Sequence, residues 1–131
     1  MESASHLVLC VDDDAVGSTI RRRLLEFGGY RVLTAIDGRS GLDLFAAHPV
    51  DVVILDYAMP EMDGGQVALH MRQIKPEVPI LMLSAYVDLP AEVVARIDLR
   101  MTKGEGAAAL LSKLGNLLAS RHIKPESDQT A

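Results

Sequence analysis

The chain has 131 residues, of which 49% are hydrophobic and 24% charged, so we expect one folded domain rather than a disordered chain. Its formal net charge of −5 argues against nonspecific nucleic-acid binding through this domain, because such binding depends on basic charge. The single cysteine, Cys10, excludes an internal disulfide framework, and no apolar run approaches the ~20 residues of a membrane span, so we expect a cytoplasmic domain.

Short apolar runs without polar alternation predict strands that are buried on both faces, as in a parallel sheet. The clearest runs are Leu7–Val11, Val52–Leu55 and Ile80–Leu83. A weaker run, Arg31–Ala35, follows a glycine pair and predicts another strand, and Leu99–Thr102 is the fifth candidate.

The segments that separate or follow these runs have the apolar spacing of helices. The first helix is expected to stop at Gly28, the second at His48-Pro49, and the third at Lys75-Pro76. The last helix is expected over Ala107–Ala119, and the polar stretch 124–131 is expected to be a disordered tail after a domain of residues 1–123. The apolar positions are Val16, Ile20, Leu24 and Phe27; Leu42, Phe45 and Ala46; Val67, Met71 and Ile74; and Leu110, Leu114, Leu117 and Leu118.

Repeated alternation of strand and helix predicts an α/β fold with a parallel sheet and right-handed crossovers. In such folds, ligands bind at the carboxyl ends of the strands, near the point where the strand order reverses. The residues that follow the predicted strands are therefore the candidate functional residues.

Polar and charged side chains stand at the ends of four predicted strands, which a parallel sheet brings to one edge. Gathered carboxylates repel one another, and a bound divalent cation removes that penalty. Oxygen ligands without histidine or cysteine favour a hard ion, and a partly hydrated Mg²⁺ fits best. With a carboxylate nucleophile, a lysine and a hydroxyl, such a site is equipped for phosphoryl transfer. These residues are Asp12, Asp13 and Asp14; Asp56; Ser84; and Lys103.

A structural role remains open for each aspartate taken alone, since aspartate at a strand end is also a common helix N-cap. Asp14 is the residue for which the capping role is most plausible. The run Arg21-Arg22-Arg23 fans across a wide arc of the first helix, which predicts a solvated face; contact with a kinase partner is the alternative.

The ordered motifs resemble those of a response-regulator receiver domain of two-component signalling (CheY-like). The resemblance rests on Val11–Asp14, on Ser84-Ala85, on Lys103, and on Asp56–Gly64, which reads Asp-Tyr-Ala-Met-Pro-Glu-Met-Asp-Gly. It covers the chain from about His6 to Ala119. The resemblance implies a doubly wound five-stranded sheet of flavodoxin-like order 2-1-3-4-5, with helices on both faces.

The resemblance also assigns roles to individual residues. It makes Asp56 the phosphoacceptor and places Mg²⁺ on Asp13 directly, on Asp12 through water, on Asp56, and on the backbone carbonyl of Ala58. Ser84 would hydrogen-bond the phosphoryl group and Lys103 would pair with it. Gly64 is expected to serve a turn that needs a positive φ.

The sequence departs from the family between Tyr86 and Gly104. Ala58 and Tyr86 occupy two positions that flank the attacking water in the family, and neither is acidic or an amide, which predicts slow self-dephosphorylation. Arg100 stands where the family has an aromatic switch residue, so we expect it to stay at the surface as a partner contact; a shifted alignment is the alternative. Gly104 replaces a common proline, so the Lys103–Gly104 peptide is expected to be trans.

Two other functions compete with phosphoacceptance. Asp12-x-Asp14-x-Val16 resembles the nucleophile motif of haloacid-dehalogenase-type phosphatases, but that reading leaves Asp56 and its context unexplained and lacks an acidic pair after Lys103. A degenerate receiver that binds partners without being phosphorylated is the second alternative, although the whole set of reactive residues is present.

A receiver implies a histidine kinase or phosphotransfer protein as donor and a downstream protein partner, with no direct nucleic-acid contact and no enzymatic activity. The expected signalling surface consists of the fourth helix, the fifth strand and the fifth helix, and a phosphorylation-dependent dimer is compatible with it. The sequence shows no effector domain, so the chain either acts by docking or is the receiver portion of a longer protein.

Overall fold

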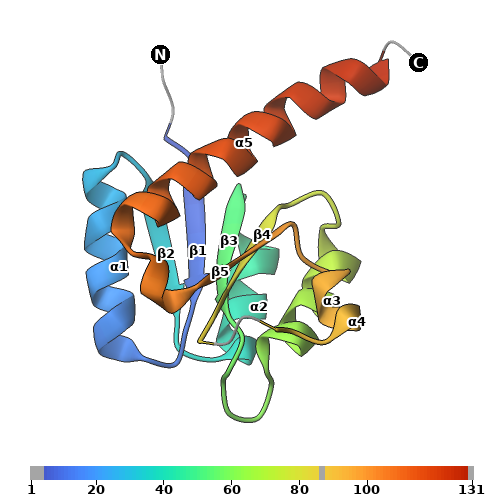
Figure 1. Ribbon diagram of the computed structural model, residues 1–131. Coiled ribbons are helices and arrows are strands. Elements are labelled where there is room, and N and C mark those ends of the chain that lie inside the picture. The colour runs from blue at the N-terminus through green and yellow to red at the C-terminus, as the bar shows by residue number, and fades with distance from the viewer. Residues whose placement is uncertain (1–4, 86–87, 130–131) are drawn as a thin grey trace.

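The structure is a computed structural model that describes residues 5–85 and 88–129, with the side chains described up to residue 120. Five parallel strands form one sheet in the order β2-β1-β3-β4-β5, and the predicted strand order is therefore confirmed (Figure 1). All five strands lie within a residue of their predicted ranges. They are β1 (Leu7–Val11), β2 (Arg31–Ala35), β3 (Val52–Asp56), β4 (Ile80–Ser84) and β5 (Leu99–Thr102).

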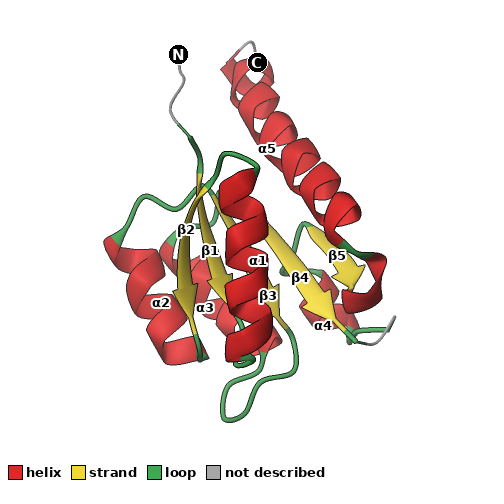
Figure 2. Cartoon of the chain, turned by 90° about the vertical axis from the view of Figure 1, so that its left-hand side faces the viewer, coloured by secondary structure: helices red, strands yellow, loops and turns green. Residues whose placement is uncertain are grey.

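The helices cover both faces of the sheet (Figures 1 and 2). Within the described residues they are α1 (Ala15–Phe27), α2 (Gly38–Ala47), α3 (Gly64–Ile74), α4 (Ala91–Val94) and α5 (Ala107–Gln129), with a short 3₁₀ helix at Lys103–Glu105. The backbone of α5 continues as a helix beyond the expected end at Ala119 and into the stretch expected to be disordered. The division of the chain after residue 123 stays a prediction.

The apolar residues of the inner strands β1, β3 and β4 pack into one of two hydrophobic cores, one on each face of the sheet, which explains the continuous apolar runs. Leu9 and Val11 of β1 point to the side of α2 and α3, where Phe45 is fully buried. Val8 and Cys10 point to the other side, where they pack with residues of α1 and α5 such as Leu114. Because both faces are covered, β1, β3 and β4 are buried at every position.

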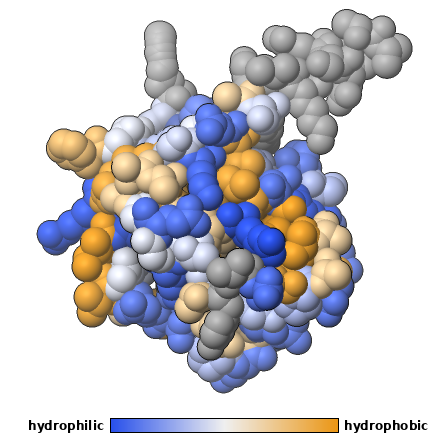
Figure 3. Space-filling model, in the orientation of Figure 1, coloured by the Kyte–Doolittle hydropathy of each residue, from blue (hydrophilic) through white to orange (hydrophobic). Residues whose placement is uncertain are grey.

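Helix α1 forms as predicted, but its apolar spacing does not mark the buried face. Val16, Ile20 and Phe27 are 72%, 65% and 93% exposed, whereas Leu25 and Ser18 are buried. Hydrophobic side chains consequently reach the surface along the edge that α1 forms, at the left of Figure 3. Within the described residues, no helix combines the length and the apolar character that crossing a membrane requires.

The segment between β4 and β5 is short, and hydrogen bonds of two arginines, one in α3 and one in the segment itself, connect it to α3. Arg72 donates to the carbonyls of Val78 and Arg96, both at 2.8 Å, and pairs with Asp98. Arg96 donates in turn to the carbonyl of Gly65 at 3.0 Å. These contacts fix a region in which α4 has only four residues.

Candidate phosphoryl-transfer site

Three carboxylates meet at the carboxyl edge of the sheet because β1 and β3 are parallel neighbours in register. Val11 pairs with Leu55, so the residues that follow in each strand, Asp12 and Asp56, lie side by side. Asp12, Asp13 and Asp56 each offer an oxygen within 4.8 Å of the others. Asp12 and Asp56 are 2% exposed, while Asp13 is exposed.

This carboxylate cluster fits a hard divalent cation. Its ligand atoms are all oxygens, one carboxylate is open to solvent, and two carboxylates are buried where their mutual repulsion is costly. The structure thus brings together the side chains predicted to hold Mg²⁺. Ala58 lies exposed in the loop after β3, and the role of its carbonyl stays a prediction.

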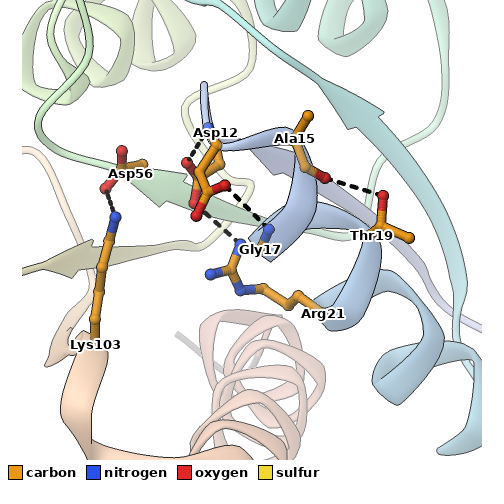
Figure 4. A network of polar contacts seen from close by, with 8 residues as sticks. Asp12, Ala15, Gly17, Thr19, Arg21, Asp56 and Lys103 are labelled. Atoms are coloured by element: carbon orange, nitrogen blue, oxygen red, sulfur yellow. Dashed lines mark hydrogen bonds and ion pairs between the residues drawn. The ribbon is translucent and has the colours of Figure 1, made fainter.

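Lys103 follows β5, the outermost strand on this side of the sheet, and its side chain extends to Asp56. The dashed line in Figure 4 marks this contact. Its Nζ lies 2.8 Å from Oδ1 of Asp56. Burial raises the pKa of Asp56 and the neighbouring Asp12 raises it further, outweighing the hydrogen bond from Lys103, which lowers it. Burial alone would lower the pKa of Lys103, but the hydrogen bond and attraction of Asp56 outweigh it, so the net shift is upward. The ammonium therefore stays charged beside the Asp56 carboxyl group.

Ser84 ends β4 at the same edge of the sheet. Asp56 pairs with Leu83, and Ser84 pairs with Thr102, so the serine is one position beyond the level of Asp56 and next to the strand that leads to Lys103. The serine is 3% exposed. The sheet thus gathers five of the predicted site residues at this edge: Asp12, Asp13, Asp56, Ser84 and Lys103.

The expected reason for Gly64 is wrong: its backbone does not have a positive φ, and Glu61 is the residue of this loop that does, at 69°. A Cβ on Gly64 would lie 2.5 Å from the carbonyl oxygen of Asp56 and 2.8 Å from Cα of Tyr57. The glycine is therefore required for close approach of α3 to the end of β3. Asp63 caps α3 by accepting from Gln66 N–H at 2.9 Å.

Asp14 takes the capping role rather than a place in the carboxylate cluster. Its side chain accepts from Gly17 N–H at 3.2 Å at the start of α1. The metal-site group found among the described residues contains Asp12, Asp13 and Asp56 and not Asp14. The second aspartate of the phosphatase-like motif, Asp14, thus caps α1, which argues against the phosphatase alternative.

Arg21 is a site residue that the sequence interpretation placed in solvent, and that expectation is wrong. Its Nη1 lies 3.1 Å from Oδ2 of Asp12, and the arginine side chain is only 16% exposed (Figure 4). Arg22 and Arg23 are exposed as predicted, and Arg22 pairs with Glu26 on the surface. The spacing of the three arginines in the sequence did not indicate that Arg21 contacts Asp12. A long side chain can reach a site more than one helical turn away from its own backbone.

The region of departure from the family is partly described. Tyr86 lies outside the described residues. Arg100 is exposed in β5, and its role as a partner contact stays a prediction. The described residues contain no cis peptide, so the expected trans bond after Lys103 is confirmed. Glu105 closes the following 3₁₀ turn by accepting from Thr102 N–H at 2.8 Å and pairing with Lys113.

Comparison with known proteins agrees with this geometry. A family model described as "Response regulator receiver domain" matches residues 8–114. Response regulator MprA of Mycobacterium avium is 38% identical over 125 residues, which cover 92% of this chain and 54% of that protein. MprA of Mycolicibacterium vanbaalenii is 44% identical over 91 residues, covering 70% of this chain and 39% of the relative. The chain therefore spans about half or less of the length of these curated relatives.

A solved structure of response regulator protein TrrA from Thermotoga maritima, in complex with Mg²⁺ and BeF, is also similar. It is 31% identical, with a TM-score of 0.80, and the match covers 86% of this chain and 99% of that one. The chemotaxis protein CheY4 of Vibrio cholerae matches with 29% identity and a TM-score of 0.78.

Proposed function

Because the chain belongs to the response-regulator receiver family, a family of signalling modules rather than enzymes, we propose that it accepts a phosphoryl group on Asp56 in a Mg²⁺-dependent reaction. The observation that carries the proposal is the buried Asp56 carboxylate, which lies against Asp12 and Asp13 and is paired with Lys103 at 2.8 Å. The similarity to a receiver structure that contains Mg²⁺ and BeF supports it.

The roles of the residues follow from charge. When bound, Mg²⁺ supplies positive charge that screens the acidic cluster and neutralises phosphoryl oxygens. An oxygen of Asp56 attacks phosphorus while the bond to the donor's imidazole nitrogen breaks, and that nitrogen keeps the electron pair. Lys103 moves its ion pair from the carboxylate to a phosphoryl oxygen, and the Ser84 hydroxyl donates a hydrogen bond to another.

The proposed donor is a histidine kinase or a phosphotransfer protein, and the proposed setting is the cytoplasm. A donor must reach a carboxylate that is 2% exposed, and exposed Val16 and Ile20 on α1 offer apolar contact area beside it. Downstream, the chain signals by contact with a protein partner and makes no direct contact with nucleic acid.

Arg100 is proposed as one of the downstream contacts, on the surface formed by α4, β5 and α5. Its exposed guanidinium is suited to carboxylate groups of a partner. Arg100→Ala is expected to weaken partner binding without changing phosphorylation of Asp56. A structure with a phosphoryl mimic in which Arg100 enters a buried slot would contradict this role.

Labelling with a small phosphodonor such as acetyl phosphate tests the phosphoacceptor. The parent protein is expected to be labelled only with Mg²⁺, and Asp56→Asn is expected to abolish labelling while the fold persists by circular dichroism. Asp43→Asn makes the same chemical change at an exposed aspartate of α2 and is expected to be labelled as the parent is. Equal labelling of Asp56→Asn would overturn the site, and a parent protein that is never labelled would favour the non-phosphorylated binding module.

A further inference from the structure

Arg21 forms an ion pair that links α1 to the carboxylate cluster. Its Nη1 lies 3.1 Å from Oδ2 of Asp12, whose other oxygen, Oδ1, accepts the N–H of Asp14 at 2.9 Å. Asp12 is 2% exposed, so its side of this contact is shielded from water. Both oxygens of a predicted metal ligand are thus engaged by the protein itself.

The charges of the cluster are already largely balanced. Three carboxylates face two cations: Lys103 is paired with Asp56, and Arg21 is paired with Asp12. The two cations approach from different elements, the end of β5 and the middle of α1. A divalent cation that binds here must therefore compete with a positive charge that is already paired with Asp12, which weakens the net attraction.

Space next to Arg21 allows its guanidinium to move. A cavity of about 290 Å³ lies between α1, the end of β5 and the start of α5, and Arg21 forms part of its wall. The other side chains of the wall are mostly apolar and include Ile20, Leu24 and Leu110. Because Arg21 itself lines this space, its charged end has room to turn away from Asp12.

We propose that Arg21 is a built-in counter-ion of the metal site, which neutralises Asp12 in the metal-free protein and lowers the affinity for Mg²⁺. This inference rests on the proposed Mg²⁺ site. Lys103 is paired with the acceptor carboxylate, whereas Arg21 is paired with a carboxylate that serves the metal alone. Release of Arg21 from Asp12 accompanies Mg²⁺ binding, so the arginine sets the Mg²⁺ concentration at which the domain becomes competent for phosphorylation.

Calorimetric titration with Mg²⁺ at fixed pH and ionic strength tests the proposal. Arg21→Ala and Arg21→Met, which keeps an apolar stem, are expected to bind Mg²⁺ about tenfold more tightly than the parent protein. Arg23→Ala removes the same charge from an exposed position of the same helix and is expected to bind as the parent does. Equal or weaker binding by both Arg21 variants, with the parent binding normally, overturns the counter-ion role alone. If neither the parent nor the variants bind Mg²⁺, the proposed metal site is overturned as well.

Thermal unfolding gives a second readout that a purely structural ion pair would not produce. Without Mg²⁺, Arg21→Ala is expected to unfold at a lower temperature than the parent, because Asp12 is left buried beside two other carboxylates. Saturating Mg²⁺ is expected to remove most of that difference, since it replaces the lost positive charge. A deficit that persists unchanged in Mg²⁺ would identify Arg21 as a structural residue and contradict the proposal.

Discussion

A single missing side chain, at Gly64, lets α3 begin against the end of β3. A Cβ there would meet the backbone of Asp56, the last residue of β3, and of Tyr57, which follows it. The N–H of Gly64 also donates to the carbonyl of Tyr57 at 2.8 Å. Asp56 and the start of α3 are therefore held close together by backbone contacts. The requirement is steric, since the φ of this glycine is accessible to any residue.

Gly64→Ala is expected to lower the free energy of unfolding by about 1–3 kcal/mol, because the added methyl group must displace backbone rather than a flexible side chain. Chemical denaturation measures the change. Gly115→Ala is the matched control, since that glycine lies in α5 with open space around it, and it is expected to stabilise the protein by about 0.5–1 kcal/mol. If Gly64→Ala has the same free energy of unfolding as the parent, the close approach of α3 to β3 does not contribute to stability.

Ala58 bears on the lifetime of the phosphorylated state. Its methyl group is exposed two residues after the acceptor and provides no group to orient a water molecule. Ala58→Asn, alone or with Tyr86→Glu, is expected to shorten the half-life of the phosphorylated protein severalfold, as measured by loss of label after the donor is removed. Ala58→Val, which adds bulk without a polar group, is the control, and an unchanged half-life in the asparagine variants would contradict the explanation.

At the scale of the elements, the strands and most of the buried faces of α3 and α5 were predictable, whereas the buried face of α1 was not. The strands β1, β3 and β4 are continuous apolar runs because both faces are covered, and this pattern identifies them directly. In α1 the apolar positions Val16 and Ile20 are exposed beside the site, so their spacing predicted the helix but not its buried face. An exposed apolar face carries the same apolar spacing in the sequence as a buried one.

The contacts that could not be predicted from the sequence are those of long polar side chains. Asp12, Asp13 and Asp56 were predictable, because short side chains at parallel strand ends can only meet at one edge. Arg21 spans from α1 to Asp12, and Arg72 spans from α3 to the β4–β5 segment, through contacts that no local pattern encodes. Which member of an arginine run turns inward is decided by the arrangement of the surrounding elements.

Arg72 is expected to hold the short α4 region in place. Its guanidinium donates to the carbonyls of Val78 and Arg96 and pairs with Asp98, so its removal leaves two partly buried carbonyls without this donor. Arg72→Ala is expected to lower the free energy of unfolding by about 2 kcal/mol or more and to speed amide hydrogen exchange between β4 and β5. Arg23→Ala, at an exposed position of α1, is expected to change neither quantity, and normal exchange in the Arg72 variant would show that α4 is held by other contacts.

For the whole molecule, Cys10 is a natural probe of global unfolding. It is the only cysteine of the chain, it lies in β1 next to the centre of the sheet, and its side chain is fully buried. Burial raises the pKa of its thiol from 9.0 to about 12, with Arg21 opposing the shift and Asp12 adding to it. The folded thiol is therefore both inaccessible and protonated at neutral pH, and reaction with a thiol reagent requires the chain to open.

The reaction of Cys10 with such a reagent is accordingly expected to be slow at pH 8 and to follow the unfolded fraction as denaturant is added. Mg²⁺ is expected to slow it further, because an ion that binds only the folded state lowers the unfolded fraction. Since the folded pKa lies above the unfolded one, this thiol favours folding below about pH 9, and that contribution is lost as the pH rises toward 12. Asp12→Asn, which alters the proposed metal site, is expected to abolish the effect of Mg²⁺ on the reaction. Fast reaction without denaturant would mean that β1 opens locally, and the sheet would then not unfold as one cooperative unit.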